Sequence, residues 1–180
     1  MIDVDLRAAA ARLAAAGIDE PMREARILAR EAPDAATFDA HIARRERREP
    51  VAYILGRKEF WSLDFEVTPA VLIPRPDSET LIETALKECK PHPARILDLG
   101  TGSGCLLVTL LKEWPQASGI GIDISPEALA VAARNAAHHG VEARAQFVRA
   151  DFAHPPRERF DLVIANPPYI ADSVVETLDP

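Results

Sequence analysis

The sequence predicts an α/β fold in which a small helical bundle and a β-hairpin precede a doubly wound parallel sheet. Three observations carry this prediction. Alanine and leucine recur at helical spacing up to about position 48, and aromatic and β-branched residues dominate positions 51–74. From Arg95 onward, short apolar runs alternate with helical patterns, which is typical of a parallel sheet. In such a doubly wound sheet we expect four strands in the order 3-2-1-4, right-handed crossovers, and helices on both faces.

The first domain, residues 1–50, is expected to hold three helices with approximate bounds 3–16, 19–31 and 34–48. Gly17 ends the first, and Pro21 lies in the first turn of the second, where proline is tolerated. The third ends in RRERRE at positions 44–49. Since two glutamates interrupt these arginines, we interpret the run as a solvated helix end rather than a basic patch.

Residues 51–75 are expected to form a β-hairpin that links the two domains. Phe60, Leu63, Phe65 and Val67 alternate as in a half-buried strand pair. A helix is then expected from the proline and capping residues at positions 76–78 to about position 87.

The central motif is RILDLGTGSG, positions 95–104, where an apolar strand runs into Gly100, Gly102 and Gly104. Glycine permits a positive φ and a close approach of backbone to a ligand, and the following helix presents its positive end. The glycine spacing differs from that of dinucleotide-binding sites, whose third glycine would stand at Cys105, so a nicotinamide-dependent dehydrogenase is disfavoured. Asp123, which ends the next strand 19 residues after Gly104, could accept both hydroxyls of a ribose.

The second chemical motif is NPPYI, positions 166–170, at the end of the fourth expected strand, 160–165. Prolines donate no N–H, so their carbonyls are free acceptors, and the side chain of Asn166 adds another. Two acceptors match an –NH2 group with its two hydrogens. Tyr169 adds an aromatic face and a hydroxyl. A third strand, 145–150, ends at Asp151 and Phe152, and a helix capped by Ser125 precedes it.

These motifs resemble known families. D-x-G-x-G-x-G followed by an acid is similar to the S-adenosylmethionine-dependent methyltransferases of Rossmann-like fold, and Asn-Pro-Pro-Tyr resembles enzymes that methylate planar nitrogens. The block PVAYILGRKEFWSLDFEVTPAVLIPRPDSETL, positions 50–81, resembles the HemK/PrmC family of protein-(glutamine-N5) methyltransferases, which act on peptide-chain release factors. Two departures are Ser62 and Ser78, where the family commonly has glycine and threonine; we expect neither to touch the reacting groups.

The resemblance implies a cofactor, S-adenosyl-L-methionine, which leaves as S-adenosyl-L-homocysteine, and a set of site residues. Asp123 would bind the ribose, Phe152 would lie beside the adenine, and Asp151 would reach its amino group. Asn166 would serve cofactor and substrate together and, with Pro167, is the expected catalytic pair. The methionine part would contact Gly100, Thr101, Gly102, Ser103 and Gly104, and the substrate Asn166, Pro167, Pro168 and Tyr169.

The same resemblance implies that residues 1–50 bind the release factor and that residues 76–180 form the methyltransferase domain. Members of the family continue for about half a domain beyond NPPY, so we expect the sheet of this chain to be incomplete. A release-factor-binding fragment without catalytic activity is therefore an alternative.

Composition limits the remaining function classes. The formal charge of −7 argues against affinity driven by phosphate neutralisation, which disfavours the other alternative, a methyltransferase acting on exocyclic amines of nucleic acids. No apolar run is long enough to span a membrane, and the N-terminus lacks a basic leader. Two cysteines, Cys89 and Cys105, make neither a disulfide framework nor a metal site. We expect a cytoplasmic protein without a metal.

Overall fold

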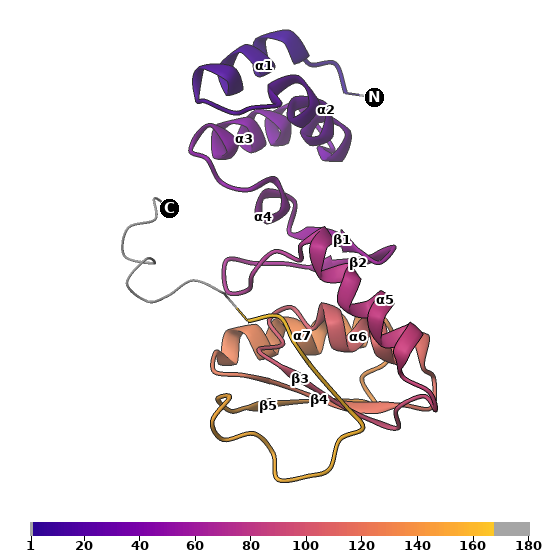
Figure 1. Cartoon of the computed structure of the whole chain (residues 1–180). Coiled ribbons are helices and arrows are strands. Elements are labelled where there is room, and N and C mark those ends of the chain that lie inside the picture. The colour runs from indigo at the N-terminus through magenta and orange to yellow at the C-terminus, as the bar shows by residue number, and fades with distance from the viewer. Residues whose placement is uncertain (1, 168–180) are drawn as a thin grey trace. The chain divides into compact units, whose positions relative to one another are not determined.

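The computed structural model describes residues 2–167, which divide into two compact units (Figure 1). The helical unit comprises residues up to 58 together with 67–69. The sheet unit comprises residues 59–66 and those from 70 on.

The helical unit is built around the buried side chains of Leu13, Leu28, Phe38 and Ile42. Asp5 and Asp34 cap two of its helices by accepting backbone N–H groups. The three expected helices are present, and a fourth, short helix follows Pro50 where the sequence analysis expected extended chain. The four helices are α1 Leu6–Ala15, α2 Pro21–Glu31, α3 Ala35–Glu46 and α4 Val51–Leu55.

Arg44 and Arg45, at the end of α3, are partly buried and hydrogen-bonded to other parts of the unit, so the interpretation of the run as solvated is wrong for these two, whereas Arg47 and Arg48 are exposed as expected. Arg44 binds the carboxylate of Glu49 at 2.5 Å and donates to the carbonyl oxygens of Tyr53 and Ile54 in α4, both at 3.2 Å. Arg45, whose side chain is only 16% exposed, reaches the carboxylate of Glu24 in α2 at 2.5 Å. These side chains join three helices of the unit.

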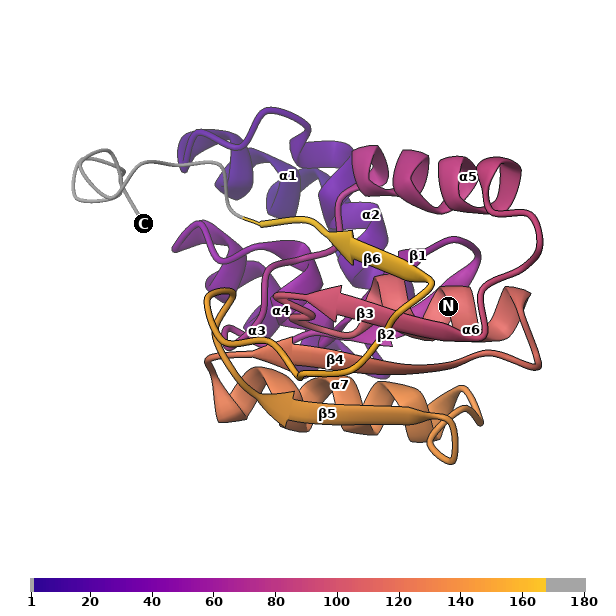
Figure 2. The same cartoon turned by 60° about the horizontal axis from the view of Figure 1, so that its bottom comes forward.

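The sheet unit contains a four-stranded parallel sheet in the order β5-β4-β3-β6, which confirms the predicted order (Figure 2). In register, Leu99 at the end of β3 lies opposite both Ile122 of β4 and Ala165 of β6. The carboxyl ends of neighbouring strands therefore leave the sheet at one edge. The strands are β3 Arg95–Leu99, β4 Ser118–Asp123, β5 Ala145–Arg149 and β6 Leu162–Ala165.

Three helices pack against one face of this sheet: α5 Glu79–Glu88, α6 Cys105–Glu113 and α7 Pro126–His138. Ile96 and Ile164 point into this core, where Leu107 and Leu110 of α6 are fully buried. The opposite face carries a smaller cluster around Leu97, Ile120 and Ile122. That cluster holds only strand and loop residues, so the expected helices on the second face are not found between residues 2 and 167.

The expected hairpin is present as β1 Arg57–Phe60 and β2 Leu63–Glu66. Trp61 and Ser62 form its two-residue turn, both with positive φ, 53° and 58°. The carboxylate of Glu79, at the start of α5, accepts the N–H of Trp61 at 2.8 Å. Phe60 and Phe65 are buried in the same core as residues of α6 and α7, so the hairpin from residue 59 to 66 packs as part of the sheet unit, whereas Arg57 and Lys58 of β1 belong to the helical unit.

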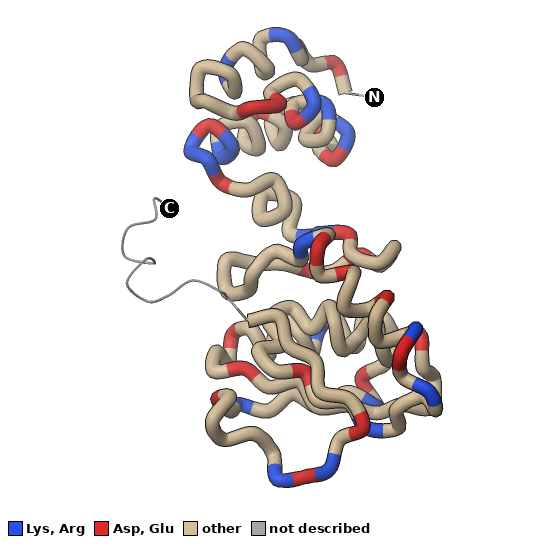
Figure 3. The backbone as a smooth tube through the Cα atoms, in the orientation of Figure 1, with Lys and Arg blue, Asp and Glu red and all other residues tan. Residues whose placement is uncertain are grey.

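Basic and acidic residues are interspersed along the backbone of both units rather than gathered on separate elements (Figure 3). Several pair across elements, as Arg12 does with Glu46 in the helical unit and Arg134 with Glu66 in the sheet unit. Across the described residues, no helix combines the length and apolar character needed to cross a membrane.

Candidate functional site

The predicted site residues lie where the four parallel strands end. Gly100 follows β3, Asp123 ends β4, Asp151 comes two residues after β5, and Asn166 directly follows β6. Pro167 follows Asn166, whereas Pro168 and Tyr169 lie outside the described residues. The parallel register brings these positions to one edge of the sheet.

The glycine loop, residues 100–104, has the backbone that its sequence predicts. Gly100, Gly102 and Gly104 have φ values of +69°, +53° and +78°, which side chains with a Cβ rarely adopt. The N–H of Gly104 closes the turn on the carbonyl of Thr101 at 2.7 Å. A methyl group placed on Gly102 would have no atom nearer than 4.0 Å. The loop thus leaves beside its backbone a space that a side chain would fill.

Asp123 connects this loop to the end of β4. Its Oδ2 accepts the N–H of Gly102 at 3.0 Å, and its Oδ1 accepts the N–H of Ser125 at 3.0 Å. A carboxylate has about four acceptor positions, so both oxygens can accept further hydrogen bonds. The geometry therefore allows Asp123 to accept hydrogen bonds from the two hydroxyl groups of a ribose, as predicted.

Phe152 contacts the glycine loop, but the carboxylate of Asp151 is engaged elsewhere. A methyl group on Gly100 would lie 3.1 Å from Cζ of Phe152, whose side chain is half exposed and presents an aromatic surface. Asp151 accepts the backbone N–H of His154 at 2.7 Å and lies 2.9 Å from its Nδ1, and these hydrogen bonds lower the pKa of the carboxyl. The structure thus brings Phe152 to the loop and shows the carboxylate of Asp151 hydrogen-bonded to His154, while a role of Asp151 at the adenine amino group stays a prediction.

Asn166 is held by Ser78, a contact that the sequence analysis excluded. The amide Nδ2 of Asn166 donates to Oγ of Ser78 at 2.7 Å. Ser78 is buried at the end of a short 3₁₀ turn, Pro76–Ser78, before α5. The expectation that Ser78 lies away from the reacting groups is therefore wrong, because its hydroxyl fixes the orientation of the Asn166 amide.

Asp98, the first residue of the D-x-G-x-G-x-G pattern, is a buried acid to which the sequence analysis gave no role. Its side chain is 1% exposed, Oδ2 accepts the hydroxyl of Thr101 at 2.7 Å, and Oδ1 has no partner among residues 2–167. Burial raises the pKa of this carboxyl to about 6. The sequence feature that could have indicated a buried carboxyl is an acid near the end of an otherwise apolar strand.

We expect Asp98→Asn to stabilise the protein at pH 7.5 and to have little effect at pH 4. The folded-state pKa, about 6, exceeds the ordinary value of 3.8, so the folded state holds more protons between these limits. Stability therefore falls as the pH rises through this window. A pKa difference of two units corresponds to roughly 3 kcal/mol of unfolding free energy. We expect Asp98→Asn to recover only about 1–2 kcal/mol of it at pH 7.5, because the buried amide of asparagine also needs hydrogen-bond partners.

Urea unfolding of the parent and Asp98→Asn at both pH values measures this difference, with the exposed Asp19→Asn as the matched control. An equal gain at pH 4 and pH 7.5 would mean that the ionised carboxylate of Asp98 is not the cause.

Cys105, which begins α6, does not supply a reactive group to the site. Burial raises the pKa of its thiol to about 12, so the side chain packs as an uncharged group behind the glycine loop. No group of three or more His, Cys, Asp or Glu side chains in the described part of the chain could hold a metal ion.

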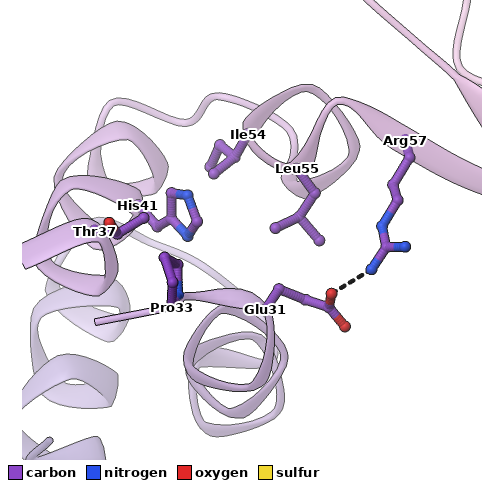
Figure 4. Close-up of a pocket in the computed structure, with 7 residues that line it drawn as sticks. All are labelled: Glu31, Pro33, Thr37, His41, Ile54, Leu55 and Arg57. Carbon is purple, nitrogen blue, oxygen red and sulfur yellow. Dashed lines mark hydrogen bonds and ion pairs between the residues drawn. The ribbon is translucent and has the colours of Figure 1, made fainter. Parts of the chain in front are cut away.

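The helical unit carries a separate cavity of about 340 Å³ (Figure 4). Ile54 and Leu55 give it an apolar side, and the ion pair between Glu31 and Arg57 lies at its edge. Nδ1 of His41 is buried and makes no hydrogen bond within the described residues. The other lining residues are Pro33 and Thr37. The wall of this cavity thus combines an apolar surface with a buried histidine nitrogen that has no partner among the described residues.

Comparison with protein families finds that residues 76–178 match the model "Methyltransferase small domain". Three similar curated relatives are called release factor glutamine methyltransferase. The protein of Rhodospirillum rubrum is 44% identical over 94% of this chain and 58% of its own length. That of Cereibacter sphaeroides is 49% identical, with coverages of 97% and 68%, and that of Agrobacterium fabrum is 42% identical, with coverages of 99% and 70%. The chain thus spans little more than half of the first of these relatives.

A solved structure with a related fold is the Pyrococcus abyssi tRNA (uracil-54, C5)-methyltransferase in complex with S-adenosyl-L-homocysteine. It matches with a TM-score of 0.52 and 24% identity, over 62% of this chain and 28% of that chain. At this level of identity the similarity concerns the fold alone.

Proposed function

Because this chain belongs to the release factor glutamine methyltransferase family, we propose that it transfers a methyl group from S-adenosylmethionine to a glutamine side-chain amide of a peptide-chain release factor. The acceptor atom is N5 of that glutamine. The reaction takes place in the cytoplasm, where the free thiols of Cys89 and Cys105 remain reduced.

The glycine loop and the ends of the neighbouring strands fit S-adenosylmethionine. The space beside Gly102 and the unpartnered Oδ1 of Asp98 suit the polar methionine part, Asp123 suits the ribose, and the exposed ring of Phe152 suits the adenine. When bound, this cofactor supplies an electrophilic methyl group on a sulfonium. The residues of this chain have to bind it, exclude water from it and align the acceptor nitrogen.

The hydrogen bond from Asn166 to Ser78 is the main observation in favour of a primary amide as the substrate group. It uses the amide nitrogen of Asn166, so Oδ1 is the atom left to face a ligand. Oδ1 and the carbonyl of Pro167 then offer two acceptors for the two hydrogens of a primary amide. An amide nitrogen is a weak nucleophile because its lone pair is delocalised. Holding both hydrogens in place directs that lone pair, and positioning of this kind can supply ~7–11 kcal/mol.

The experiment that tests this proposal is methylation of a purified release factor, with the modified atom located by mass spectrometry. It should be run with the chain itself and with a complete protein carrying these residues, since the chain spans 58–70% of the three relatives described above. We expect a single methyl group on a glutamine nitrogen. Methylation of tRNA or rRNA fragments in place of the release factor would show that the substrate is a nucleic acid.

Variants of Ser78 can separate the orientation of the Asn166 amide from the binding of the cofactor. Ser78→Ala removes the acceptor that fixes the Asn166 amide, and we expect kcat to fall about 5- to 10-fold, the value of roughly one neutral hydrogen bond. Ser78→Thr keeps the hydroxyl and should stay within about twofold of the parent. Steady-state kinetics and calorimetry with S-adenosylhomocysteine measure both effects. A Ser78→Ala protein with unchanged kcat would contradict the proposed role.

We further propose that the helical unit binds the release factor and that the cavity around His41 receives part of it. The support is the buried Nδ1 of His41, which has no partner among the described residues, beside the apolar surface of Ile54 and Leu55. A side chain of the release factor with an apolar body and a polar end would pack against the apolar surface and form a hydrogen bond with the histidine nitrogen.

His41→Ala should therefore raise the KM for the release factor about 3- to 10-fold, with kcat and cofactor affinity unchanged, because it removes one buried hydrogen bond to the partner. Arg26→Ala, on an exposed position of the same unit, serves as the control. Equal KM values for the two variants would place the release factor away from this cavity.

A further inference from the structure

Asn135, in the third turn of α7, forms hydrogen bonds to two segments that are far apart in sequence. Its side chain is 1% exposed. Oδ1 accepts the N–H of Glu66 at 2.7 Å, and Nδ2 donates to the carbonyl of Glu66 at 3.0 Å and to the carbonyl of Ser103 at 2.8 Å. Both N–H groups and the oxygen of the amide are therefore used on backbone atoms. One side chain thus joins the last residue of β2 to Ser103 of the glycine loop.

The neighbouring contacts make the hairpin a fixed support for this amide. Arg134, which directly precedes Asn135 in the sequence, pairs with the carboxylate of Glu66 at 2.7 Å. Nε2 of His139 lies 2.9 Å from the carbonyl oxygen of Asp64, and the centroid of its ring lies 4.9 Å from that of the Phe65 ring. Of these three links between α7 and the hairpin, the one made by Asn135 also reaches the glycine loop.

The loop side of this contact is tightly packed. Ser103 is 2% exposed, and Gly104 lies so close to α7 that a methyl group on it would come within 3.1 Å of Cβ of Ala132. Ala132 and Asn135 are three residues apart, so they lie on the same face of the helix. That face therefore sets the position of the loop by close packing at Gly104 and by a hydrogen bond at Ser103.

From these contacts we infer that Asn135 is a positioning residue for the cofactor loop and couples the loop to the hairpin. The inference rests on the proposed function, because the ligand of the loop is S-adenosylhomocysteine or its methylated form. With the backbone of Glu66 as a support, Asn135 fixes the peptide groups between Gly102 and Gly104 in the conformation that binds ligand. Because coupling between two sites is reciprocal, bound ligand must in turn stabilise the end of β2.

Calorimetry with S-adenosylhomocysteine tests the first half of this inference. Asn135→Ala removes all three hydrogen bonds, and Asn135→Asp keeps an acceptor for the N–H of Glu66 but loses the donor to Ser103. We expect both to raise the dissociation constant about 5- to 30-fold. Arg134→Ala, the matched control, breaks the adjacent contact between α7 and the hairpin without touching the loop, and should stay within about twofold of the parent.

Amide hydrogen exchange in the unsubstituted protein tests the second half and needs no variant to fold. Saturating S-adenosylhomocysteine should slow exchange at the N–H of Glu66 about fivefold or more, whereas the N–H of Ala32 in the helical unit should not change. Binding with neither a change at Glu66 nor a difference between the Asn135 variants and Arg134→Ala would overturn the inference alone. Failure of the unsubstituted protein to bind S-adenosylhomocysteine would instead overturn the proposed function on which it rests.

Discussion

Asn166→Ala should lower kcat for methylation of the release factor about 10²- to 10³-fold while cofactor affinity stays within about threefold. This is the range typical of removing one preorganised hydrogen-bonding group from an active site. The alanine removes the Oδ1 acceptor for the substrate nitrogen and leaves the hydroxyl of Ser78 without its donor. The glycine loop is not touched by the change, so binding and turnover should separate.

Asn166→Asp is the matched variant, since it preserves the volume and one acceptor oxygen but adds a negative charge and removes the donor to Ser78. We expect a smaller loss of kcat than for alanine. Single-turnover methyl transfer, followed by mass spectrometry, measures both variants. If Asn166→Ala methylates the glutamine as fast as the parent, or if the methyl group is found on an oxygen, then the assignment of Asn166 is wrong.

Asp123→Ala should weaken binding of S-adenosylhomocysteine by about 1.5–3 kcal/mol, roughly 10- to 100-fold. That is the usual value of hydrogen bonds to a charged group. The change removes the proposed acceptor of the ribose hydroxyls, and it also frees the N–H groups of Gly102 and Ser125 that the carboxylate now accepts. Asp123→Asn, which keeps one acceptor oxygen, should lose less.

The control is Glu127→Ala, which removes an exposed negative charge from the first turn of α7, close to the same strand end. Calorimetry gives the dissociation constants, and circular dichroism verifies that each variant is folded. An Asp123→Ala protein that is folded and binds as tightly as Glu127→Ala would rule out the ribose assignment.

The order of the sheet could be predicted because each of its strands is a short apolar run followed by a residue that stops it. RILDL ends at Gly100 and GIGID ends at Asp123, and strands that alternate with helices in this way are typical of a doubly wound sheet, for which the order 3-2-1-4 is expected. Helix α4 was missed because Val51, Tyr53 and Ile54 are residues that favour strands, and its five residues are too few to show a helical period.

The contacts that orient the site could not be predicted from local patterns. Ser78 and Asn166 are 88 residues apart, and Asn135 and Glu66 are 69 apart, so only the folded chain brings each pair together. The glycines and Asp123 could be placed relative to one another because they belong to consecutive elements, a strand, a turn, a helix and the next parallel strand, whose ends lie together. Side chains that support the site from other elements carry no comparable spacing.

Burial of Cys105 has a practical consequence for handling the protein. Alkylating reagents and peroxide attack the thiolate, and because desolvation raises the pKa of this partly buried thiol, little of it is ionised at pH 7. The glycine loop should therefore remain chemically intact under mild oxidation or cysteine labelling. Thiol-directed labels should therefore react slowly at Cys105, the residue that begins α6; the other cysteine of the sequence, Cys89, lies just beyond the end of α5 and is also partly exposed.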